Sequence, residues 1–249
     1  MAQAVIQELL TPKVRGGHVI VKTKAVAINP TDWKAIHREN EKSIGTKSGC
    51  DFAERIAGLS RRAKVLDKED GSFGEYITVQ ADVQFHNPLS DEEGASLGVS
   101  VFTALQLPTN PVSTPTPILI YGGSTASGLW GIQFAKLSGY KVITTASPRN
   151  FNYLKSLRAN VVFNYNSPTV IEDIITAANG ELTYVWNCIS EGESIYGTPF
   201  ERGSYKEGQP EDNEFAKHFR DISEKLIQEG KVKPPKIELN CGGSGLEGI

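Results

Sequence analysis

A glycine-rich turn between an apolar run and a helix-like stretch is the part of this sequence best suited to chemistry. Residues 118–121 form the apolar run, and Gly122, Gly123 and Gly128 follow it. Glycines let a backbone approach an anion closely, and a helix N-terminus offers it unpaired N–H groups. The spacing is not G-x-G-x-x-G, but the strand before, the helix after and a second strand about 20 residues on predict a pyrophosphate site rather than an ordinary loop. The turn residues that this pattern assigns to cofactor binding are the glycines, above all Gly122 and Gly123.

The end of the second strand, residues 141–145, indicates which dinucleotide the turn would hold. A site for NAD usually has an Asp or Glu there, which accepts hydrogen bonds from the ribose diol. This sequence has Ser147, Pro148, Arg149 and Asn150 instead, with no carboxylate. A hydroxyl and a guanidinium suit a 2′-phosphate, so the sequence favours NADP. The alternative is that Ser147 only caps a helix and that Arg149 is a solvated surface charge.

The elements around this turn alternate between strand and helix. Apolar runs at 118–121, 141–145, 161–163 and 182–189 are separated by stretches with helical periodicity and caps. This order predicts an α/β fold with a doubly wound parallel sheet. The chain before it is different, because residues 18–28 and 72–79 have the patterns of antiparallel strands.

Other local signals place the remaining elements. Ser90 and Glu93 form a capping box that predicts a helix running to about Leu107. Four prolines between 108 and 117 indicate a linker. A further helix is expected at about 211–229, ended by Gly230, and a short strand at 236–239.

Composition excludes several classes of function. The net charge of −3 offers no basic excess for nucleic acid, and no apolar run approaches the ~18 residues of a membrane span. The first residues lack the pattern of a signal peptide. Three distant cysteines and four scattered histidines form no CxxC or HExxH motif, so neither a disulfide framework nor a metal is expected. A reducing, cytoplasmic location is the prediction.

With these residues in place, the sequence resembles the medium-chain dehydrogenase/reductase superfamily, in its metal-free, quinone-oxidoreductase-like branch. It is especially similar to the trans-acting enoyl reductases that serve polyketide synthases in fungal secondary metabolism. The matching segments occur in family order and cover most of the chain. They are residues 26–34 (VAINPTDWK), 48–53 (SGCDFA), 73–79 (FGEYITV), 93–105, 117–139, 140–150 and 212–225.

The resemblance implies a GroES-like β-barrel catalytic domain at 1–96 and a Rossmann NADP-binding domain at 97–230. It also implies a return segment to the catalytic domain at 231–249. The family's next elements are missing after 53 and after 190, and its last helix and strand are missing at the end, so both domains are expected to be incomplete. The resemblance also implies site roles. It assigns Thr31, Asp32, Trp33 and Lys34 to the nicotinamide end, places Thr103 beside the substrate carbonyl and places Tyr165 near the adenosine. The other residues that it assigns to the cofactor are Ser124, Thr125, Ala126 and Ser127 of the turn, and Ser147, Pro148, Arg149 and Asn150 after the second strand.

Without a metal, hydride transfer depends on the cofactor and on positioning. When hydride adds to an enoyl thioester, charge develops on the thioester oxygen, where a hydroxyl or an ammonium would stabilise it. Thr103 and Lys34 are the catalytic candidates by type and by mapped position. Thr103 could instead bond the preceding helical turn, and Lys34 could be an exposed helix lysine.

Three functions remain open from the sequence. The first is NADPH-dependent reduction of an activated double bond, in an enoyl substrate that is small or bound to an acyl carrier, with a polyketide synthase as a possible partner, or in a quinone. The second is a non-catalytic NADP-binding remnant that regulates or scaffolds a biosynthetic complex. The third is a fragment that does not fold stably.

Overall fold

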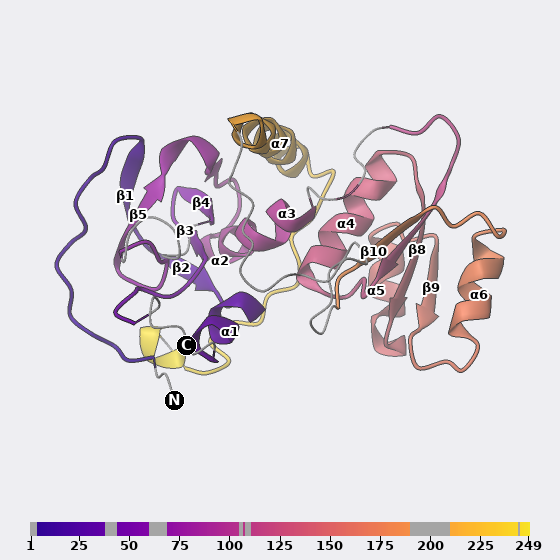
Figure 1. Ribbon diagram of the computed structural model, residues 1–249, viewed down its shortest axis with the longest axis horizontal. Helices are drawn as coiled ribbons and strands as arrows, with labels where there is room; N and C mark the ends of the chain where they lie inside the picture. Colours follow the sequence, from indigo (N-terminus) through magenta and orange to yellow (C-terminus); the bar gives the residue numbers. More distant parts are fainter. Residues whose placement is uncertain are drawn as a thin grey trace. The chain divides into compact units, whose positions relative to one another are not determined.

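The structure, a computed structural model, describes residues 4–37, 44–59, 69–104, 107, 111–189, 210–243 and 245–249 (Figure 1). Its contacts divide the chain into two compact units, Met1–Phe102 with Glu214–Ile249, and Thr103–Asn213. The domain limits at 96/97 and 230/231 stay a prediction. In this division, residues 97–102 and most of helix α7 (Pro210–Gln228) group with the first unit.

The first unit contains two antiparallel sheets. Strand β1 (His18–Lys22) pairs with β5 (Tyr76–Gln80). The second sheet has the order β2-β3-β4-β6, from β2 (Ala25–Ala27), β3 (Asp51–Ala53), β4 (Ile56–Leu59) and β6 (Phe85–His86). Phe52, Ile77 and Val79 pack with Val21 in a core that joins the two sheets. This arrangement and that of the second unit confirm the predicted combination of a GroES-like barrel with a Rossmann sheet.

The predicted strand at 18–28 is two strands, because the chain changes partner in its middle. The N–H of Thr23 donates to the carbonyl of Glu75 (2.9 Å), whereas that of Lys24 donates to Ala53 (3.0 Å). The predicted strand at 72–79 begins only at Tyr76. The N–H groups of residues 72 and 73 instead bond the carbonyls of residues 49 and 48.

The capping box at Ser90 is confirmed, but the helix it opens is shorter than predicted. Helix α2 (Asp91–Ala95) ends at a C-cap, Ser96, and a second helix, α3 (Gly98–Ala104), begins two residues later. The break lies where Asp51 approaches, since its Oδ1 accepts the N–H of Val99 at 2.8 Å. A Cβ on Gly98 would lie 2.1 Å from the same oxygen. A distant carboxylate therefore restarts the helix.

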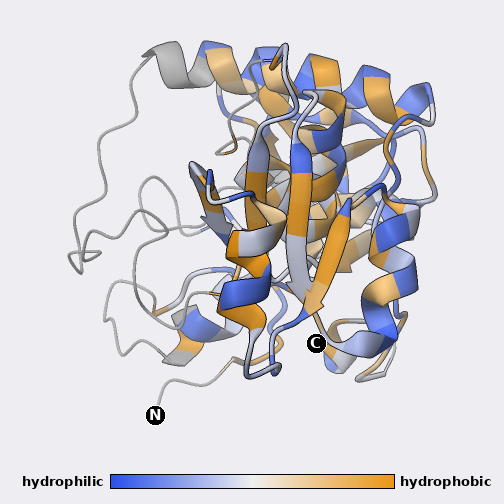
Figure 2. Cartoon of the chain, turned by 90° about the vertical axis from the view of Figure 1, so that its right-hand side faces the viewer, coloured by the Kyte–Doolittle hydropathy of each residue, from blue (hydrophilic) through white to orange (hydrophobic). Residues whose placement is uncertain are grey.

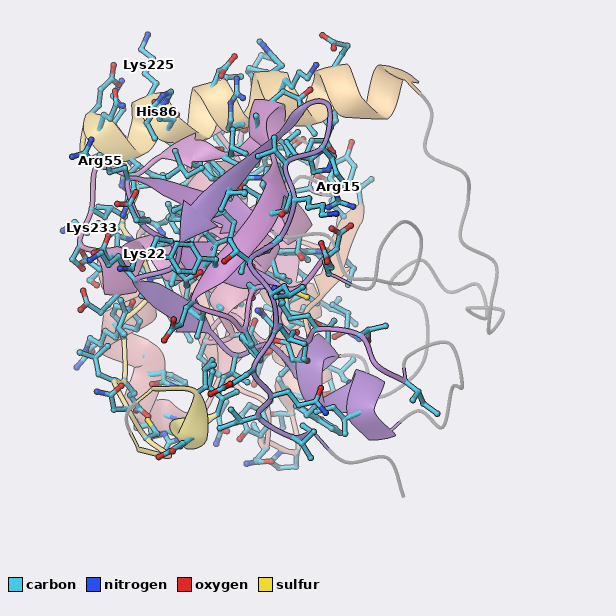
Figure 3. All side chains as sticks on the ribbon, turned by 90° about the vertical axis from the view of Figure 1, so that its left-hand side faces the viewer. Arg15, Lys22, Arg55, His86, Lys225 and Lys233 are labelled. Atoms are coloured by element: carbon cyan, nitrogen blue, oxygen red, sulfur yellow. The ribbon has the colours of Figure 1, made fainter. Side chains whose placement is uncertain are left out.

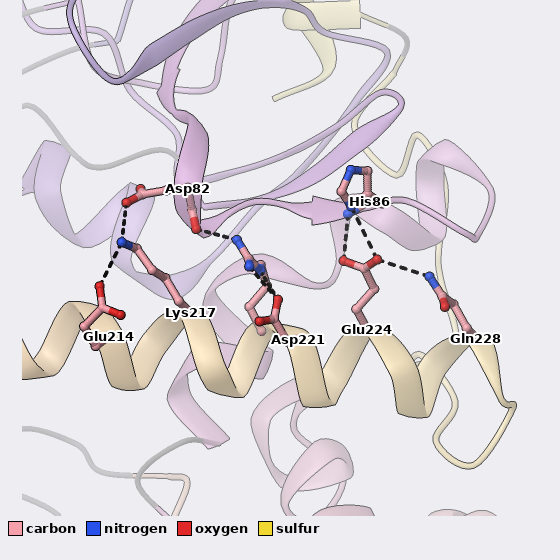
Figure 4. Close-up of polar contacts among 8 residues, drawn as sticks. Asp82, His86, Glu214, Lys217, Asp221, Glu224 and Gln228 are labelled. Atoms are coloured by element: carbon pink, nitrogen blue, oxygen red, sulfur yellow. Dashed lines mark hydrogen bonds and ion pairs between the residues drawn. The ribbon is translucent and has the colours of Figure 1, made fainter.

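Helix α1 (Pro30–His37) follows β2, and the 3-10 turn η2 (Ala81–Val83) follows β5. Helix α7 is held on the first unit by polar contacts from one of its faces (Figure 4). Lys217 Nζ lies 2.9 Å from Asp82 Oδ2, and Arg220 donates to the carbonyl of Asp82. Glu224 accepts the N–H of His86 at 3.1 Å. Basic side chains at the surface of this unit include Arg15, Lys22, Arg55, His86, Lys225 and Lys233 (Figure 3).

The predicted strand at 236–239 is wrong. These residues join no sheet of the described structure, and only the 3-10 turn η4 (Gly245–Gly248) follows them. Leu239 is 60% exposed, and two prolines without N–H groups precede the segment. A short apolar alternation forms a strand only where a partner edge and a core face are within reach.

The second unit is a parallel sheet with the order β10-β7-β8-β9. Its strands are β7 (Pro117–Tyr121), β8 (Lys141–Ala146), β9 (Val161–Asn164) and β10 (Tyr184–Asn187). Its helices are α4 (Ala126–Leu137), α5 (Phe151–Ser156) and α6 (Val170–Ala177), with the 3-10 turn η3 (Pro148–Asn150) before α5. The strands are largely apolar and the helices are amphipathic or buried (Figure 2). The alternation read from the sequence is therefore confirmed.

The helix cap considered for Ser147 is present as a position but not as a side-chain hydrogen bond. Ser147 precedes η3 with Pro148 at the first position, yet its hydroxyl caps no N–H group. Thr169 is the N-cap of α6, also without a side-chain cap bond. None of the described helices is both long and apolar enough to cross a membrane.

Candidate functional site

The glycine-rich turn is fixed by the end of the neighbouring strand. Gly122 has a φ of 87°, a conformation that favours glycine. Its N–H donates to Thr145 Oγ1 at 3.0 Å, and the N–H of Gly123 donates to the carbonyl of Thr145 at the same distance. The hydroxyl of Thr144 donates to the carbonyl of Ile120 at 2.6 Å. The two threonines of β8 therefore hold the turn in place. The sequence reasoning did not assign this role to Thr144 and Thr145. Their position, as polar residues near the end of an otherwise apolar strand, was the signal that could have indicated it.

Thr125 begins helix α4 and leaves other amides available. Its Oγ1 accepts the N–H of Gly128 at 3.0 Å and donates to the carbonyl of Gly122 at 2.9 Å. Within the described residues, the N–H groups of Ala126 and Ser127 have no acceptor. Ala126 is exposed and Ser127 is half-buried. The first turn of this 12-residue helix can thus donate hydrogen bonds to an anion.

The end of β8 presents groups that suit a phosphate. Arg149 is exposed, and the hydroxyl of Ser147 accepts a hydrogen bond from Asn150 Nδ2 at 3.4 Å. Tyr165 follows β9 and is 42% exposed. Because β7, β8 and β9 are adjacent and parallel, their carboxyl ends share one edge of the sheet. The structure therefore gathers the predicted turn, the residues 147–150 and Tyr165 at this edge.

A protonated thiol, Cys188, lies close to the turn, and no role was predicted for it. Burial raises the pKa of Cys188 to about 12, although a hydrogen bond with Thr125 acts in the opposite direction. The N–H of Cys188 donates to the carbonyl of Tyr121 at 2.9 Å. The thiol therefore stays neutral at physiological pH and places no negative charge beside the amides of α4.

The predicted nicotinamide-end residues form the first turn of helix α1. Thr31, Trp33 and Lys34 are exposed, and Lys34 Nζ lies 5.5 Å from the centre of the Trp33 ring. Asp32 differs from them, since it is 2% exposed and its Oδ2 accepts the N–H of Asn29 at 2.7 Å. Asp32 thus bonds back to the N–H of the residue before the helix, as the acidic side chain of a capping box does.

Asp51 lies on β3 and contacts both segments that carry the catalytic candidates. Its Oδ2 accepts a hydrogen bond from Asn29 Nδ2 at 2.9 Å, and its Oδ1 accepts the N–H of Val99 at 2.8 Å. The pKa of Asp51 is raised to about 7, mainly by burial and to a smaller extent by the charge of Asp32, while the two hydrogen bonds act in the opposite direction. The sequence reasoning gave this residue no role, although a lone acid beside Phe52 in an apolar strand was a usable signal. Thr103 lies four residues after Val99, on the same face of α3.

The described residues include no group of three or more His, Cys, Asp or Glu side chains that could hold a metal ion.

Comparisons with known proteins place the chain in a family. No family model matches it. It is 39% identical over 213 residues to Trans-enoyl reductase TOXD of Cochliobolus carbonum, in a match that covers 74% of this chain and 71% of that protein. It is 36% identical to Trans-enoyl reductase ACTTS2 of Alternaria alternata, over 76% of this chain and 63% of the relative. The chain thus spans about two thirds of the length of these relatives.

Solved structures with the same fold are more distant in sequence. A quinone oxidoreductase from Pseudomonas syringae has a TM-score of 0.68 at 18% identity, over 92% of this chain and 86% of the other. The Escherichia coli quinone oxidoreductase complexed with NADPH has a TM-score of 0.66 at 17% identity, over 90% and 83%. CurK enoyl reductase also has a TM-score of 0.66, at 16% identity, over 93% and 85%. With the fold and the relatives in agreement, the chain belongs to the trans-enoyl reductases, a family of oxidoreductases, and it has the fold of the quinone oxidoreductases.

Proposed function

We propose that this protein reduces an activated carbon–carbon double bond with NADPH and without a metal, and that its substrate class is the enoyl thioester. One observation carries the proposal. The turn after β7 offers the N–H groups of Ala126 and Ser127, while the adjacent end of β8 bears Ser147 and Arg149 and no carboxylate. The names of its relatives, trans-enoyl reductases of fungi, support the same chemistry.

The residues present fit NADPH. The first turn of α4 would hold the diphosphate, because its unpaired amides and the positive end of the helix dipole favour negative charge. Arg149 and Ser147 would hold the 2′-phosphate, and Tyr165 would lie near the adenosine. Thr31, Trp33 and Lys34 are assigned to the nicotinamide end. Asp32 is assigned there through its capping of helix α1, since its carboxylate is buried.

When bound, NADPH supplies the hydride that adds to the β-carbon of the enoyl group. The protein then has to stabilise the negative charge that develops on the thioester oxygen. The hydroxyl of Thr103 and the ammonium of Lys34 are the groups proposed for this role. The proton for the α-carbon comes from water in this scheme, since no described residue stands out as a general acid.

The proposal is tested by adding NADPH to the purified protein and measuring thermal unfolding and absorbance at 340 nm. At about 100 times Kd, a ligand that binds only the folded state adds about 2.7 kcal/mol of stability. We expect this stabilisation, followed by NADPH oxidation when enoyl thioesters are added. Absence of a shift would contradict the proposal. A shift without oxidation would indicate the binding module, and oxidation by quinones alone would indicate a quinone oxidoreductase.

The carrier of the substrate is a separate proposal. We propose that the enoyl chain arrives on the acyl carrier of a polyketide synthase and that the reaction takes place in the cytoplasm. The expected result is a higher kcat/KM for a carrier-bound enoyl thioester than for the same acyl group on a small thiol. Equal values for the two substrates would remove the carrier from the proposal.

Replacing Arg149 with alanine should weaken NADPH binding much more than NADH binding. The guanidinium is exposed at the end of β8 and would form charge-assisted hydrogen bonds only with a 2′-phosphate. We expect the Kd for NADPH to rise about 10-fold to 100-fold, as for the loss of a hydrogen bond to a charged group, while the Kd for NADH changes little. Fluorescence titration with both cofactors measures this. Arg158→Ala, in the same unit, is the control and should leave both Kd values unchanged, and an equal effect of Arg149→Ala on both cofactors would refute the assignment.

A further inference from the structure

Asp51 joins two segments that are far apart in the chain. Asn29 immediately precedes helix α1, and Val99 is the second residue of helix α3. Both donate to the Asp51 carboxylate, at 2.9 Å and 2.8 Å, so that each oxygen holds one segment. Asp51 is 2% exposed, and a Cβ on Gly98 would lie 2.1 Å from Oδ1, so the carboxylate fits closely against the start of α3.

We propose that Asp51 is a positioning residue, whose carboxylate fixes the α1 segment that carries Lys34 relative to the α3 helix that carries Thr103. This inference rests on the proposed function for the roles of Lys34 and Thr103. Asp51 acts through these two residues and touches no reacting atom in this scheme. Lys34 follows Asn29 by one helical turn, and Thr103 follows Val99 by one turn, so a shift at either hydrogen bond displaces a candidate group.

The ionised form of Asp51 is the one suited to this task. A carboxylate accepts at both oxygens, whereas a protonated carboxyl has only one oxygen that is a full acceptor and turns a hydroxyl toward a donor. The charged group that acts on Asp51 is Asp32 of helix α1, which disfavours ionisation, as burial does. Asn29 and the Val99 amide oppose them. The Asp51 carboxyl is therefore held in surroundings that disfavour its ionised form, at the position proposed to fix α1 and α3.

The first test exchanges the hydrogen-bond donor at residue 29 and the acceptor at residue 51. In Asp51→Asn, the new NH₂ faces the NH₂ of Asn29, which can keep a bond to residue 51 only by turning its amide over and giving up its contact with the carbonyl of Ala27 (3.5 Å). In the double variant Asn29→Asp with Asp51→Asn, the amide of residue 51 can donate to the new carboxylate while its oxygen still accepts from Val99. We expect kcat to fall about 10-fold or more in the single variant, as for the loss of a charge-assisted hydrogen bond, and to recover largely in the double variant. The Kd for NADPH should stay unchanged in both.

The second test uses pH. The kcat of the wild-type protein should decline as the pH falls below about 7, where Asp51 takes up a proton, and this decline should be absent in Asp51→Asn. Stability moves the other way. Because the folded-state pKa lies above the unfolded value, the contribution of the protonated carboxyl is complete below pH 4 and is lost as pH rises through about 7. The Tm of Asp51→Asn minus that of the wild type should therefore increase by about 5 °C between pH 5 and pH 8.

The third test does not depend on activity. Amide hydrogen exchange should become faster at 30–37 and at 98–104 in Asp51→Asn, with no change in β7 or α4, and should return toward wild-type rates in the double variant. Asp70→Asn is the matched control, because Asp70 is also buried in this unit, paired with Arg15. It should lower Tm without changing exchange in α1 and α3 or the pH profile.

The outcomes separate this inference from the proposed function. If the wild type oxidises no NADPH with any enoyl thioester or quinone, the proposed function fails, and hydrogen exchange alone judges the link. Unchanged exchange in both helices of Asp51→Asn would overturn the positioning role. In an active enzyme, an unchanged kcat in Asp51→Asn would also overturn the positioning role. A loss of kcat in Asp51→Asn that the double variant does not reverse, and that Asp70→Asn reproduces, would overturn it as well.

Discussion

Replacing Gly128 with alanine is expected to reduce the affinity for NADPH by about 100-fold or more, as for the loss of several hydrogen bonds to charged groups. A Cβ on residue 128 would lie 2.5 Å from the carbonyl oxygen of Gly122 and 2.9 Å from Gly123 Cα. Both of these are backbone atoms, so the new methyl group cannot be accommodated by moving a flexible side chain. The turn and the start of α4 would have to separate.

The separation would act on the anion site directly. The Gly122 and Gly123 amides are anchored to Thr145, so movement of the turn breaks those hydrogen bonds or pulls α4 away from the sheet. Either result displaces the amides of Ala126 and Ser127 from the position that the turn gives them. We also expect a loss of about 1–3 kcal/mol in the free energy of unfolding, as for overpacking of a buried site.

Fluorescence titration with NADPH and thermal unfolding of Gly128→Ala test this prediction. Gly180→Ala is the control in the same unit. Gly180 has a φ of 74° with no atom near the position of a Cβ, so alanine costs about 1 kcal/mol of backbone strain there. It should leave the affinity unchanged. NADPH binding by Gly128→Ala at the wild-type Kd would show that the diphosphate lies elsewhere.

Replacing Thr103 with valine is expected to reduce kcat by about 100-fold while the affinity for NADPH stays nearly constant. Valine keeps the shape of threonine and removes the hydroxyl proposed to face the thioester oxygen. Because that oxygen gains charge only as hydride is transferred, the missing hydrogen bond raises the barrier more than it weakens binding.

Steady-state kinetics with an enoyl thioester and a separate NADPH titration measure the two effects. Ser100→Ala is the control on the same helix, since its hydroxyl donates to the carbonyl of Ser96 at 2.6 Å and has no assigned role in the reaction. It should leave kcat within about 3-fold of the wild type, the range expected for a local hydrogen bond distant from the chemistry. Unchanged turnover in Thr103→Val would remove Thr103 from the proposed reaction.

Signals that are local in the chain predicted most of the second unit. Strand, turn and helix follow one another between residues 117 and 137, and each is encoded by neighbours: the apolar run, the glycines and the cap at Thr125. The capping box at Ser90 and the end of α7 near Gly230 are local in the same way. The hydrogen bonds of these turns and caps join residues only three or four apart, so these elements could be predicted from neighbouring residues without a structure.

Contacts between distant residues decided the rest. The helix predicted from Ser90 to Leu107 breaks because Asp51, 48 residues away, accepts the N–H of Val99. The glycine turn takes its shape from Thr145, which is 23 residues from Gly122. The strand expected at 236–239 is absent because no sheet edge pairs with it. The sequence by itself determined the order of strands and helices in the second unit, its glycine turn and the local caps. Only the tertiary structure decided how these segments are held, since an acceptor from another part of the chain can compete with the local backbone for the same N–H group.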